Sequence, residues 1–485
     1  MLNNLKNNIL VLFLVSLLII ILQQGEINRD GILYLTQAQF ITEQSWDKAL
    51  SLYNWPFFSL LISGLHQLTG LSLQVAAHVT NVIFFLLASL FFLKTVSLLS
   101  ENKNSTFLAT LILLTSIPVM DDYLGMVLRD HGQWAGFMMG VYGYFRWVQS
   151  PSWAWALFWQ GAFIFGALFR PECLIFNILL PVTHQLFLIK NNRIKMLIQS
   201  TGIFIVGFVF LLFAWVIFNI QIDSIDFGRL NEIVSRPAKF LKTVLSPLPI
   251  YTDNFYLKVL IADYATSFKY FFLTYVVVYK WLAGVGLLHL VLFWYALKQR
   301  LLTSQNAKVL AVFFLLSSII TVVNLYTTYV IANRYWVLNF WIVYIVAAIG
   351  LDQLWKSLQG FKSGIKIWIK RGLVAVLGIY FLNIIVDKPR LHFEQEAGYW
   401  IKQSRIDLNN VYFSSHRAAF YAGLLGANEV DFNEAMSVIQ YQYLVITYNR
   451  FDDKQTIPNY REIQHFPSSK NPKVIIYQRI HDDLQ

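Results

Sequence analysis

The chain has 485 residues, of which 56% are hydrophobic and 13% charged, and its formal net charge is +11 at pH 7. Ordinary soluble domains carry about 25% charged residues, so this composition indicates an integral membrane protein. A nucleic-acid-binding protein gathers Lys and Arg on one soluble face, whereas here they fall between apolar runs, which argues against nucleic acid as a partner. The single cysteine, Cys173, excludes an internal disulfide and a cysteine-based zinc site.

The first apolar run, 9–22, is expected to be a retained membrane helix, because it lacks a small-x-small cleavage site and further spans follow. Directly after it comes the stretch Ile27-Asn28-Arg29-Asp30-Gly31-Ile32-Leu33-Tyr34. An acidic side chain at the end of a membrane helix needs water, a partner or a substrate. Asp30 is therefore a candidate functional residue, and a solvated loop carboxylate is the alternative.

Apolar runs long enough to cross about 30 Å of hydrocarbon predict about eleven transmembrane helices. They lie near residues 8–23, 74–99, 106–120, 132–149, 153–170, 172–189, 197–219, 271–297, 308–330, 335–355 and 372–387. Basic residues gather in alternate loops around 103, 190–195, 298–308 and 356–371, which the positive-inside rule places in the cytoplasm. The other loops, and everything after about residue 388, are then expected outside the cytoplasmic membrane.

One of these outer loops is dense in ionisable groups: Asp121, Asp122, Arg129, Asp130 and His131. A site that binds a phosphate-bearing lipid and activates a hydroxyl needs a carboxylate to take a proton and an Arg to hold the phosphate bidentately. Asp30 with the Arg129-Asp130-His131 run would supply both. An interfacial loop that only favours water is the alternative. A divalent cation on Asp121, Asp122 and His131 is a further reading, although the spacing is not diagnostic of a metal.

Two arginines stand at later junctions between spans. Arg170-Pro171-Glu172 interrupts an apolar stretch and indicates a turn at the outer surface, where an Arg170–Glu172 ion pair tethering two helix ends is one interpretation. Arg334 has no acid nearby in the sequence, so an anion such as a lipid phosphate, or a distant carboxylate, is its expected partner.

Between these junctions, residues 230–245 repeat apolar side chains at helical spacing with basic residues between them. This pattern is typical of a helix that lies on a membrane surface. Such a helix would be either a lid that touches lipid headgroups over a site or a structural anchor with snorkelling lysines.

The last hundred residues differ in character, because the apolar runs shorten to strand length at 411–413, 443–448 and 474–477. Helical stretches at 394–402 and 417–425 lie between them, which predicts a small α/β domain. The expected fold is thus an all-α polytopic membrane domain over 1–387, followed by a small extracytoplasmic α/β domain over 388–485.

Several of these segments together resemble the GT-C polyprenyl-phosphate-sugar glycosyltransferases, which include the protein O-mannosyltransferases and the lipid A aminoarabinose transferases. The motifs that carry the resemblance are Arg29-Asp30-Gly31-x-x-x-Tyr34, Trp55-Pro56-Phe57-Phe58, Leu68-Thr69-Gly70, Leu168-Phe169-Arg170-Pro171-Glu172 and Asn333-Arg334-Tyr335-Trp336. Each is weak alone, and their order along most of the chain makes the match.

The resemblance implies inverting transfer of a sugar from an undecaprenyl- or dolichyl-phosphate donor to a hydroxyl of a lipid, glycan or protein, outside the cytoplasmic membrane. Asp30 and Asp130 are the catalytic candidates. The substrate-binding candidates are Arg29, Tyr34, Arg129, His131, Arg170, Glu172, Arg334 and Tyr335. The chain departs from the family pattern in having Gly31 where a second acid is usual, and Glu43 and Asp47 are both candidates to replace it.

Two other classes compete with the glycosyltransferase. A transporter or flippase of lipid-linked sugars would line a path with buried charges and break no bond, but such folds usually show internal repeats and discontinuous helices, and the sequence shows no repeat. A non-catalytic assembly protein would leave the carboxylate and arginines on separate loops unexplained.

Overall fold

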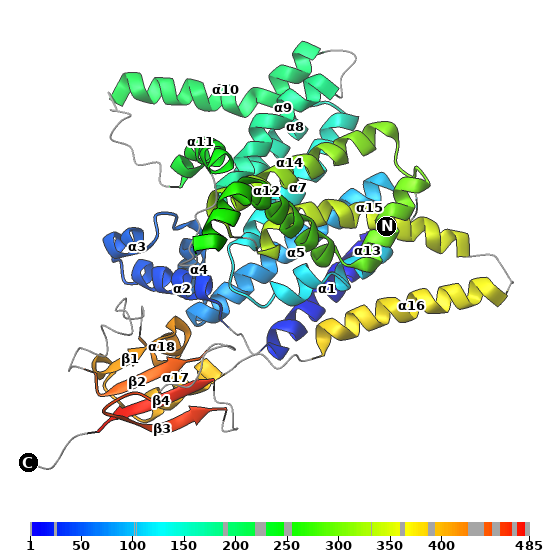
Figure 1. Ribbon diagram of the computed structural model, residues 1–485. Coiled ribbons are helices and arrows are strands. Elements are labelled where there is room, and N and C mark those ends of the chain that lie inside the picture. Colours follow the sequence, from blue (N-terminus) through cyan, green and yellow to red (C-terminus); the bar gives the residue numbers. More distant parts are fainter. Residues whose placement is uncertain are drawn as a thin grey trace, which may run out of the picture. The chain divides into compact units, whose positions relative to one another are not determined.

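A computed structural model describes residues 2–23, 27–100, 102, 104–187, 193–218, 229–246, 255–330, 332–358, 364–386, 393–424, 441–448, 456–467 and 473–480. The chain forms two compact units (Figure 1). The first unit comprises Met1–Leu22 and His78–Val386, and the second comprises Gln23–Ala77 and Asp387–Gln485. The second unit therefore includes a segment that the sequence assigned to the membrane domain. The division into domains at 387/388 stays a prediction, since a compact unit need not fold independently.

Helices build the first unit. In its first half they are α1 (Leu2–Leu22), α5 (Leu73–Leu99), α6 (Ser105–Leu114), the π-helical turn η1 (Ile117–Asp122), α7 (Asp130–Gln149), α8 (Trp153–Phe169), the 3-10 turn η2 (Pro171–Cys173), α9 (Leu174–Phe187) and α10 (Arg193–Phe218). Its second half contains α11 (Leu230–Leu245), α12 (Phe255–Val285), α13 (Leu287–Lys298), α14 (Ser304–Thr328), η4 (Asn333–Trp336), α15 (Val337–Leu358) and α16 (Gly364–Ile385).

Helices occur at all eleven places where the sequence predicts spans. Among the described residues, five helical segments are long and apolar enough to cross a membrane: Leu5–Leu22, Leu73–Leu99, Ser304–Thr328, Asn333–Leu358 and Ile367–Ile385. The protein is therefore a multi-pass membrane protein, and the count of eleven spans is not confirmed. The expected third span is interrupted, because α6 ends at Leu114 and Pro118, which lacks a backbone donor, lies in the π-helical turn that follows.

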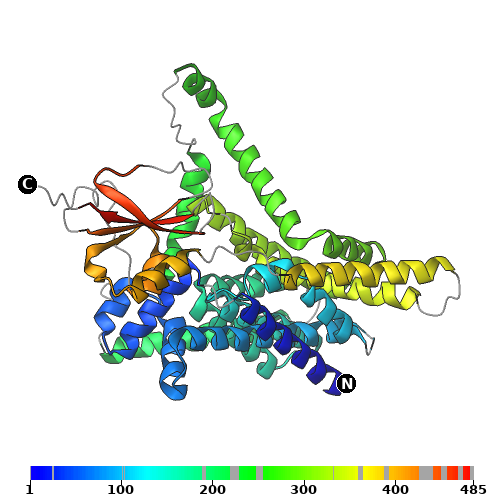
Figure 2. The same cartoon turned by 90° about the horizontal axis from the view of Figure 1, so that it is seen from below.

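The expected span at 271–297 is also broken. Ser267–Val285 and Leu287–Lys298 would pass together as one membrane helix, but they meet at an angle of 92°. Gly286 separates them with a φ of +80°, a conformation that glycine adopts without the strain that a side chain would cause. The green helices α12 and α13 show this bend in Figure 2. The chain thus contains a discontinuous helix that its apolar pattern does not reveal.

The helices α7 and α8 form an antiparallel hairpin with a very close approach. A Cβ atom added at Gly136 would lie 2.5 Å from Cα of Gly166 and 2.7 Å from the carbonyl oxygen of Ala162. Small residues let two helix backbones come this close. Because α7 and α8 have 20 and 17 residues and are joined by a short turn, the start of α7 and the end of α8 lie at the same end of the hairpin.

The second unit begins with three helices: α2 (Arg29–Thr42), α3 (Trp46–Leu52) and α4 (Phe57–Thr69). The buried amide of Gln37 ties them together. Its Nε2 donates to the carbonyls of Ala49 and Tyr53, and its Oε1 accepts a hydrogen bond of 2.8 Å from Ser59. The backbone N–H of Ile27 donates to the Tyr421 hydroxyl, at 3.2 Å, which links this segment to the C-terminal part of the same unit.

The C-terminal part is a small α/β fold. Its elements are α17 (Phe393–Gln403), η5 (Leu408–Asn410), β1 (Val411–Phe413), α18 (His416–Ala422), β2 (Tyr443–Thr447), β3 (Tyr460–Phe466) and β4 (Val474–Arg479). The strand order is β1-β2-β4-β3, with β1 and β2 parallel and the other pairs antiparallel. The register pairs Val411 with Tyr443 and Thr447 with Val474. The three strands and two helices expected from the sequence are present, whereas β3 was not anticipated.

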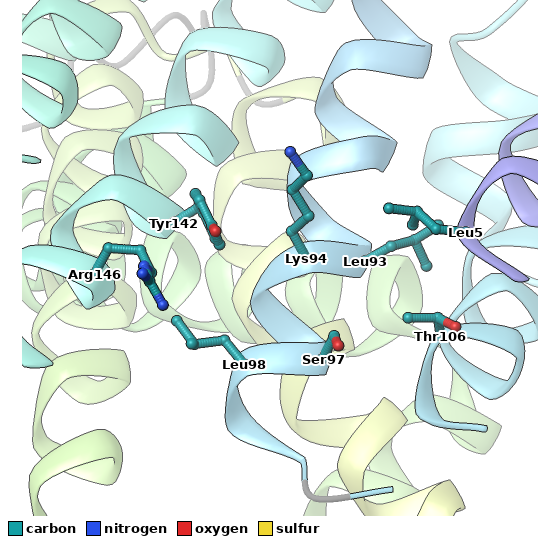
Figure 3. Close-up of a pocket in the computed structure, with 8 residues that line it drawn as sticks. All are labelled: Leu5, Leu93, Lys94, Ser97, Leu98, Thr106, Tyr142 and Arg146. Carbon is teal, nitrogen blue, oxygen red and sulfur yellow. The ribbon is translucent and has the colours of Figure 1, made fainter. Parts of the chain in front are cut away.

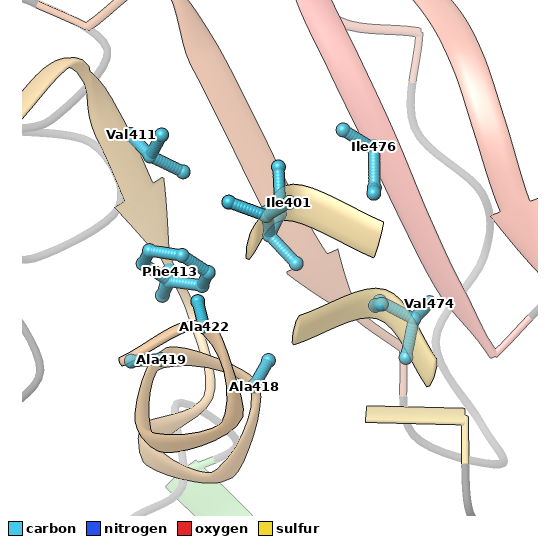
Figure 4. Packing of buried hydrophobic residues seen from close by; sticks show 10 residues of the cluster. Ile401, Val411, Phe413, Ala418, Ala419, Ala422, Val474 and Ile476 are labelled. Carbon is cyan, nitrogen blue, oxygen red and sulfur yellow. The ribbon is translucent and has the colours of Figure 1, made fainter. Parts of the chain in front are cut away.

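Alternate side chains of the strands point to opposite faces of the sheet, as the two-residue period of a strand requires. One face carries Phe413, Val445 and Ile476, which pack against Ala418 and Ile401 from the two helices (Figure 4). The other face is rich in tyrosine, including Tyr412 and Tyr477.

Candidate functional site

Residues 121–131, from the end of η1 to the first turn of α7, form one side of a charged region in the first unit. Asp121, Arg129, Asp130 and His131 are all buried there. The side-chain amide of Asn81 on α5 donates to the carbonyl of Met126, at 2.9 Å, which holds the middle of the segment. The ring nitrogen Nδ1 of His131 lies 3.1 Å from the carbonyl oxygen of Leu128. The outer loop of the sequence analysis is therefore an ordered, buried turn.

Arg170 enters the same region from the end of α8. Its backbone is extended, because the residue before a proline is disfavoured in the helical conformation, and this ends the helix at Phe169. Its Nη2 lies 2.8 Å from Oδ1 of Asp130, and both side chains are nearly inaccessible to solvent. A buried ion pair thus joins the start of α7 to the end of α8, at the open end of the hairpin.

Glu172 takes its own partner from another helix. Its Oε1 lies 2.8 Å from Nη1 of Arg236 on α11. Arg170 and Glu172 thus each form an ion pair with another element, with Asp130 and Arg236. Arg170 also attracts the Glu172 carboxylate, so the expected tether between these two residues stays a prediction. Lys269 on α12 fixes α11 in turn, since its buried amine donates to the last carbonyls of that helix, including those of Thr243 and Val244.

Arg334 and Tyr335 complete the region from η4, at the start of α15. The backbone N–H of Arg334 donates to the Tyr123 hydroxyl, at 3.0 Å. The Tyr335 ring lies near two guanidinium groups. Its centroid is 4.9 Å from Cζ of Arg170 and 5.4 Å from Cζ of Arg334. Stacking of this kind orients the planar groups while leaving their edges for hydrogen bonds.

We name Arg129, Arg170, Arg236 and Arg334, with Asp130 and Glu172, the arginine cluster. Burial by itself raises the pKa of Asp130, but attraction to Arg170, Arg334 and Arg129 outweighs it and holds this pKa below its usual value. The same competition lowers the pKa of Glu172 to about 2, where burial is opposed chiefly by Arg170 and Arg236. Asp130 is the first residue of α7 and Glu172 lies in η2, and neither belongs to a candidate span. They are ionised at neutral pH, and they neutralise part of the arginine charge.

The chemistry of this arrangement is anion recognition. Guanidinium groups bind phosphate through two parallel N–H bonds, and a site shielded from water strengthens each bond. Asp130, held ionised by its arginine neighbours, is suited to orient them and is poorly suited to accept a proton, because protonation would break a buried ion pair.

An apolar cavity of about 480 Å³ adjoins the cluster at the Glu172–Arg236 pair. Its walls come from α9, α11 and α14, through residues such as Leu179, Phe240 and Ile320. A ligand with an anionic head and a hydrocarbon tail matches this combination of charge and apolar surface.

The remaining candidates belong to the second unit. Arg29 and Asp30 lie in the first turn of α2, where an acid also favours the helix dipole. Tyr34 is buried, and its ring packs edge-on against Tyr53 and Phe58. Of the two candidates for the missing acid, Glu43 ends α2 and accepts a hydrogen bond from Gln39, whereas Asp47 lies exposed in the first turn of α3.

The alternative reading of a divalent cation has no ligand set in the part of the chain that the structure describes. No three His, Cys, Asp or Glu side chains gather there as metal ligands, and this covers Asp121, Asp122 and His131.

Sequence reasoning missed two residues of this region: Arg236 in the arginine cluster and Tyr123 beside it. Arg236 was grouped with the basic residues of an amphipathic helix, although it lies one residue before Pro237 and on the side of α11 that faces Glu172. Tyr123 gave no signal, because a tyrosine between two spans is common in membrane proteins.

The described parts define a multi-pass helical membrane protein with a small α/β fold. No protein-family model and no curated protein sequence matches the chain. ArnT from Cupriavidus metallidurans bound to undecaprenyl phosphate is similar with a TM-score of 0.49 and 12% identity, over 98% of both chains. The archaeal oligosaccharyltransferase AglB from Archaeoglobus fulgidus, in complex with an inhibitory peptide and a dolichol-phosphate, is similar with a TM-score of 0.44 and 13% identity.

The match to AglB covers 81% of this chain and 61% of the other, so this chain spans less than two thirds of that protein's length. Both solved structures are GT-C fold polyprenyl-phosphate glycosyltransferases, the class that the sequence resembles. Both TM-scores lie below 0.5, so function has to follow from the chain's own side chains.

Proposed function

We propose that the protein is a membrane glycosyltransferase that uses a polyprenyl-phosphate sugar as donor. The observation that carries the proposal is the convergence of four arginines from four separate segments on two buried carboxylates, beside an apolar cavity. The arginine cluster would bind the donor phosphate, and the cavity would take the first part of the prenyl chain. The distribution of basic loops supports a reaction on the outer face of the cytoplasmic membrane.

In the proposed reaction, a hydroxyl oxygen of the acceptor attacks the anomeric carbon of the sugar. The bond between that carbon and the phosphate oxygen breaks, and the polyprenyl phosphate leaves with one additional negative charge. Guanidinium groups stabilise this charge as it develops, which lowers the barrier more than it strengthens donor binding. The hydroxyl proton passes to a carboxylate, for which Asp30 remains the sequence-based candidate.

Arg334→Lys tests the donor site. Lysine retains the charge but cannot form the bidentate contact, so the donor Michaelis constant should rise by about 10-fold to 100-fold. The assay follows transfer of a radiolabelled sugar from a polyprenyl-phosphate donor in membranes that contain the protein. Arg371→Lys is the matched control, because Arg371 is exposed on α16 and lies over Trp368. Unchanged donor affinity in Arg334→Lys would remove this residue from the site.

A flippase of lipid-linked sugars is the second candidate, and the sharp break between α12 and α13 favours it, since discontinuous helices are typical of transporters. The same assay separates the two functions. A transferase forms a labelled product from the donor and acceptor, whereas a flippase moves the donor across the bilayer and leaves its sugar–phosphate bond intact.

A further inference from the structure

A basic pocket, distinct from the apolar cavity beside the arginine cluster, lies in the first unit between α1, α5, α6 and α7. Its volume is about 300 Å³, and Lys94 and Arg146 reach into it from neighbouring helices, with Tyr142 between them (Figure 3). The other lining residues are apolar or carry a hydroxyl: Leu5, Leu93, Ser97, Leu98 and Thr106. Among the residues that the structure describes, no acidic side chain lines it.

Aromatic rings position the two cations. The Lys94 amine lies 5.1 Å from the ring centroid of Phe91 and 5.9 Å from that of Tyr142. The Arg146 guanidinium lies 5.1 Å from the ring centroid of Trp155. Among the described residues neither cation has an ion-pair partner, and the buried Nε of Arg146 has no hydrogen-bond acceptor. Two cations without a described carboxylate partner, beside an apolar wall, favour an anion with a hydrocarbon part.

This pocket is remote from the arginine cluster. Arg146 follows Asp130 by 16 residues on α7, and Lys94 follows His78, a neighbour of His131, by 16 residues on α5. At 1.5 Å per residue, either helix separates the two regions by about 24 Å. That distance approaches the hydrocarbon thickness of a bilayer, so the pocket lies near the opposite membrane surface. The basic loops indicate that this surface is the cytoplasmic one.

We propose that Lys94 and Arg146 bind the phosphate of an anionic phospholipid from the cytoplasmic leaflet, with an acyl chain against Leu5, Leu93 and Leu98. Basic pockets between membrane helices on the cytoplasmic side recognise such headgroups. The lipid would bridge α5 and α7 at the end where the described residues provide no ion pair between them. This site is independent of the proposed sugar transfer.

The test is a titration of the purified full chain with phosphatidylglycerol in mixed micelles, read by native mass spectrometry. The double variant Lys94→Gln/Arg146→Gln should bind this lipid about 30-fold more weakly than wild type, at about fivefold for each basic group. The matched control is Lys370→Gln/Arg371→Gln, which likewise removes one Lys and one Arg that lie over aromatic rings, here Trp355 and Trp368, outside any described cavity. The control should change affinity by less than about threefold, because Arg371 is exposed, Lys370 is partly exposed, and charges at a protein surface contribute little.

A second variant separates charge from packing. Lys94→Arg/Arg146→Lys keeps both charges and should retain most of the affinity, whereas an equal loss in this variant and in the glutamine pair would overturn the proposal. An equal loss in the control pair would also overturn it, since that result shows only general attraction to an anionic surface. Phosphatidylcholine should bind weakly, and inorganic phosphate should not compete at millimolar concentration. Phosphate binding as tight as that of the lipid would assign the pocket to a free anion instead.

Discussion

Asp130 and Asp30 present two different carboxylates. Asp130 is ion-paired with Arg170 through Oδ1 and attracted by further guanidinium groups, so its negative charge is already compensated. Asp30 lies at the start of α2 in the second unit, where a negative charge also stabilises the helix end. The sequence makes both residues catalytic candidates. The sequence alone does not distinguish a carboxylate that forms ion pairs with arginines from one that acts as a general base.

Substitution of Asp30 by Asn tests its role as general base. Asn keeps the size and most hydrogen bonds but loses the basic lone pair, so transfer should fall by roughly 10²-fold to 10⁴-fold while the donor still binds. Radiolabelled transfer and donor binding are measured on the same membranes. Transfer within a few-fold of wild type would leave Asp30 as a helix-end charge and direct attention to Asp122. Glu43→Gln and Asp47→Asn, assayed in parallel, decide between the two candidates for the second acid.

Glu172 gives the cluster a defined acid response. Its pKa is lowered from 4.5 to about 2 in the folded protein, so its ion pair contributes stability above about pH 4.5 that is lost as the pH falls toward 2. Thermal unfolding of the detergent-purified protein between pH 7 and pH 3 should show this loss, and Glu172→Gln should lack that component. Glu396→Gln, exposed on α17, should follow the wild-type curve. A parallel acid response in wild type and Glu172→Gln would contradict the assignment.

At the scale of elements, helix positions follow closely from apolar runs, whereas breaks within them do not. The interruption after α6 has a visible cause in Pro118, but the 92° bend at Gly286 depends on packing that a hydropathy pattern does not contain. The strand β3 escaped prediction because Arg461, Glu462 and His465 give it the composition of a loop. An edge strand that pairs only with β4 tolerates such residues.

The α7–α8 hairpin provides a test of how packing positions the cluster. Gly136→Ala places a methyl group against the backbone of Gly166, so the helices must separate, at a cost of about 1–3 kcal/mol. The midpoint of thermal unfolding should fall, and donor affinity should weaken as Asp130 moves away from Arg170. Gly161→Ala on α8 is the control, since its Cβ would meet nothing within 4 Å. It should raise stability slightly, by about 0.5–1 kcal/mol, because alanine favours the helix. Equal unfolding midpoints for the two variants would show that the close approach is unimportant.

At the scale of the whole molecule, the cluster was partly predictable. The arginines at 129, 170 and 334 were recognised because each stands at a junction between apolar runs, and junctions on one side of a membrane lie at one end of the helical unit. Their individual partners were not predictable. The pairing of Glu172 with Arg236 joins residues 64 positions apart, and it depends on how α11 packs beside α14.

The orientation of the chain remains a prediction with a direct measurement. Arg334 lies just before α15, at the end of this helix nearest the arginine cluster. Near the other end, Asp352 accepts a hydrogen bond of 2.9 Å from Ser100 and forms an ion pair of 3.2 Å with Lys356. The positive-inside rule assigns this second end to the cytoplasm and the C-terminus to the outside. Alkaline phosphatase fused after Gln485 should therefore be active, and a cytoplasmic reporter at the same place inactive. The reverse result would place the arginine cluster on the cytoplasmic face.

The ion pair at the end of the α7–α8 hairpin also determines where the chain tolerates insertions. One extra residue within α7 rotates everything before it by about 100° and shifts it by 1.5 Å, which turns Asp130 away from Arg170. An extra residue in the turn at Ser150 or Pro151 leaves both helices in register. Length variation among natural relatives of this hairpin should therefore accumulate in the turn, and the spacing from Asp130 to Gly136 and from Gly166 to Arg170 should stay constant.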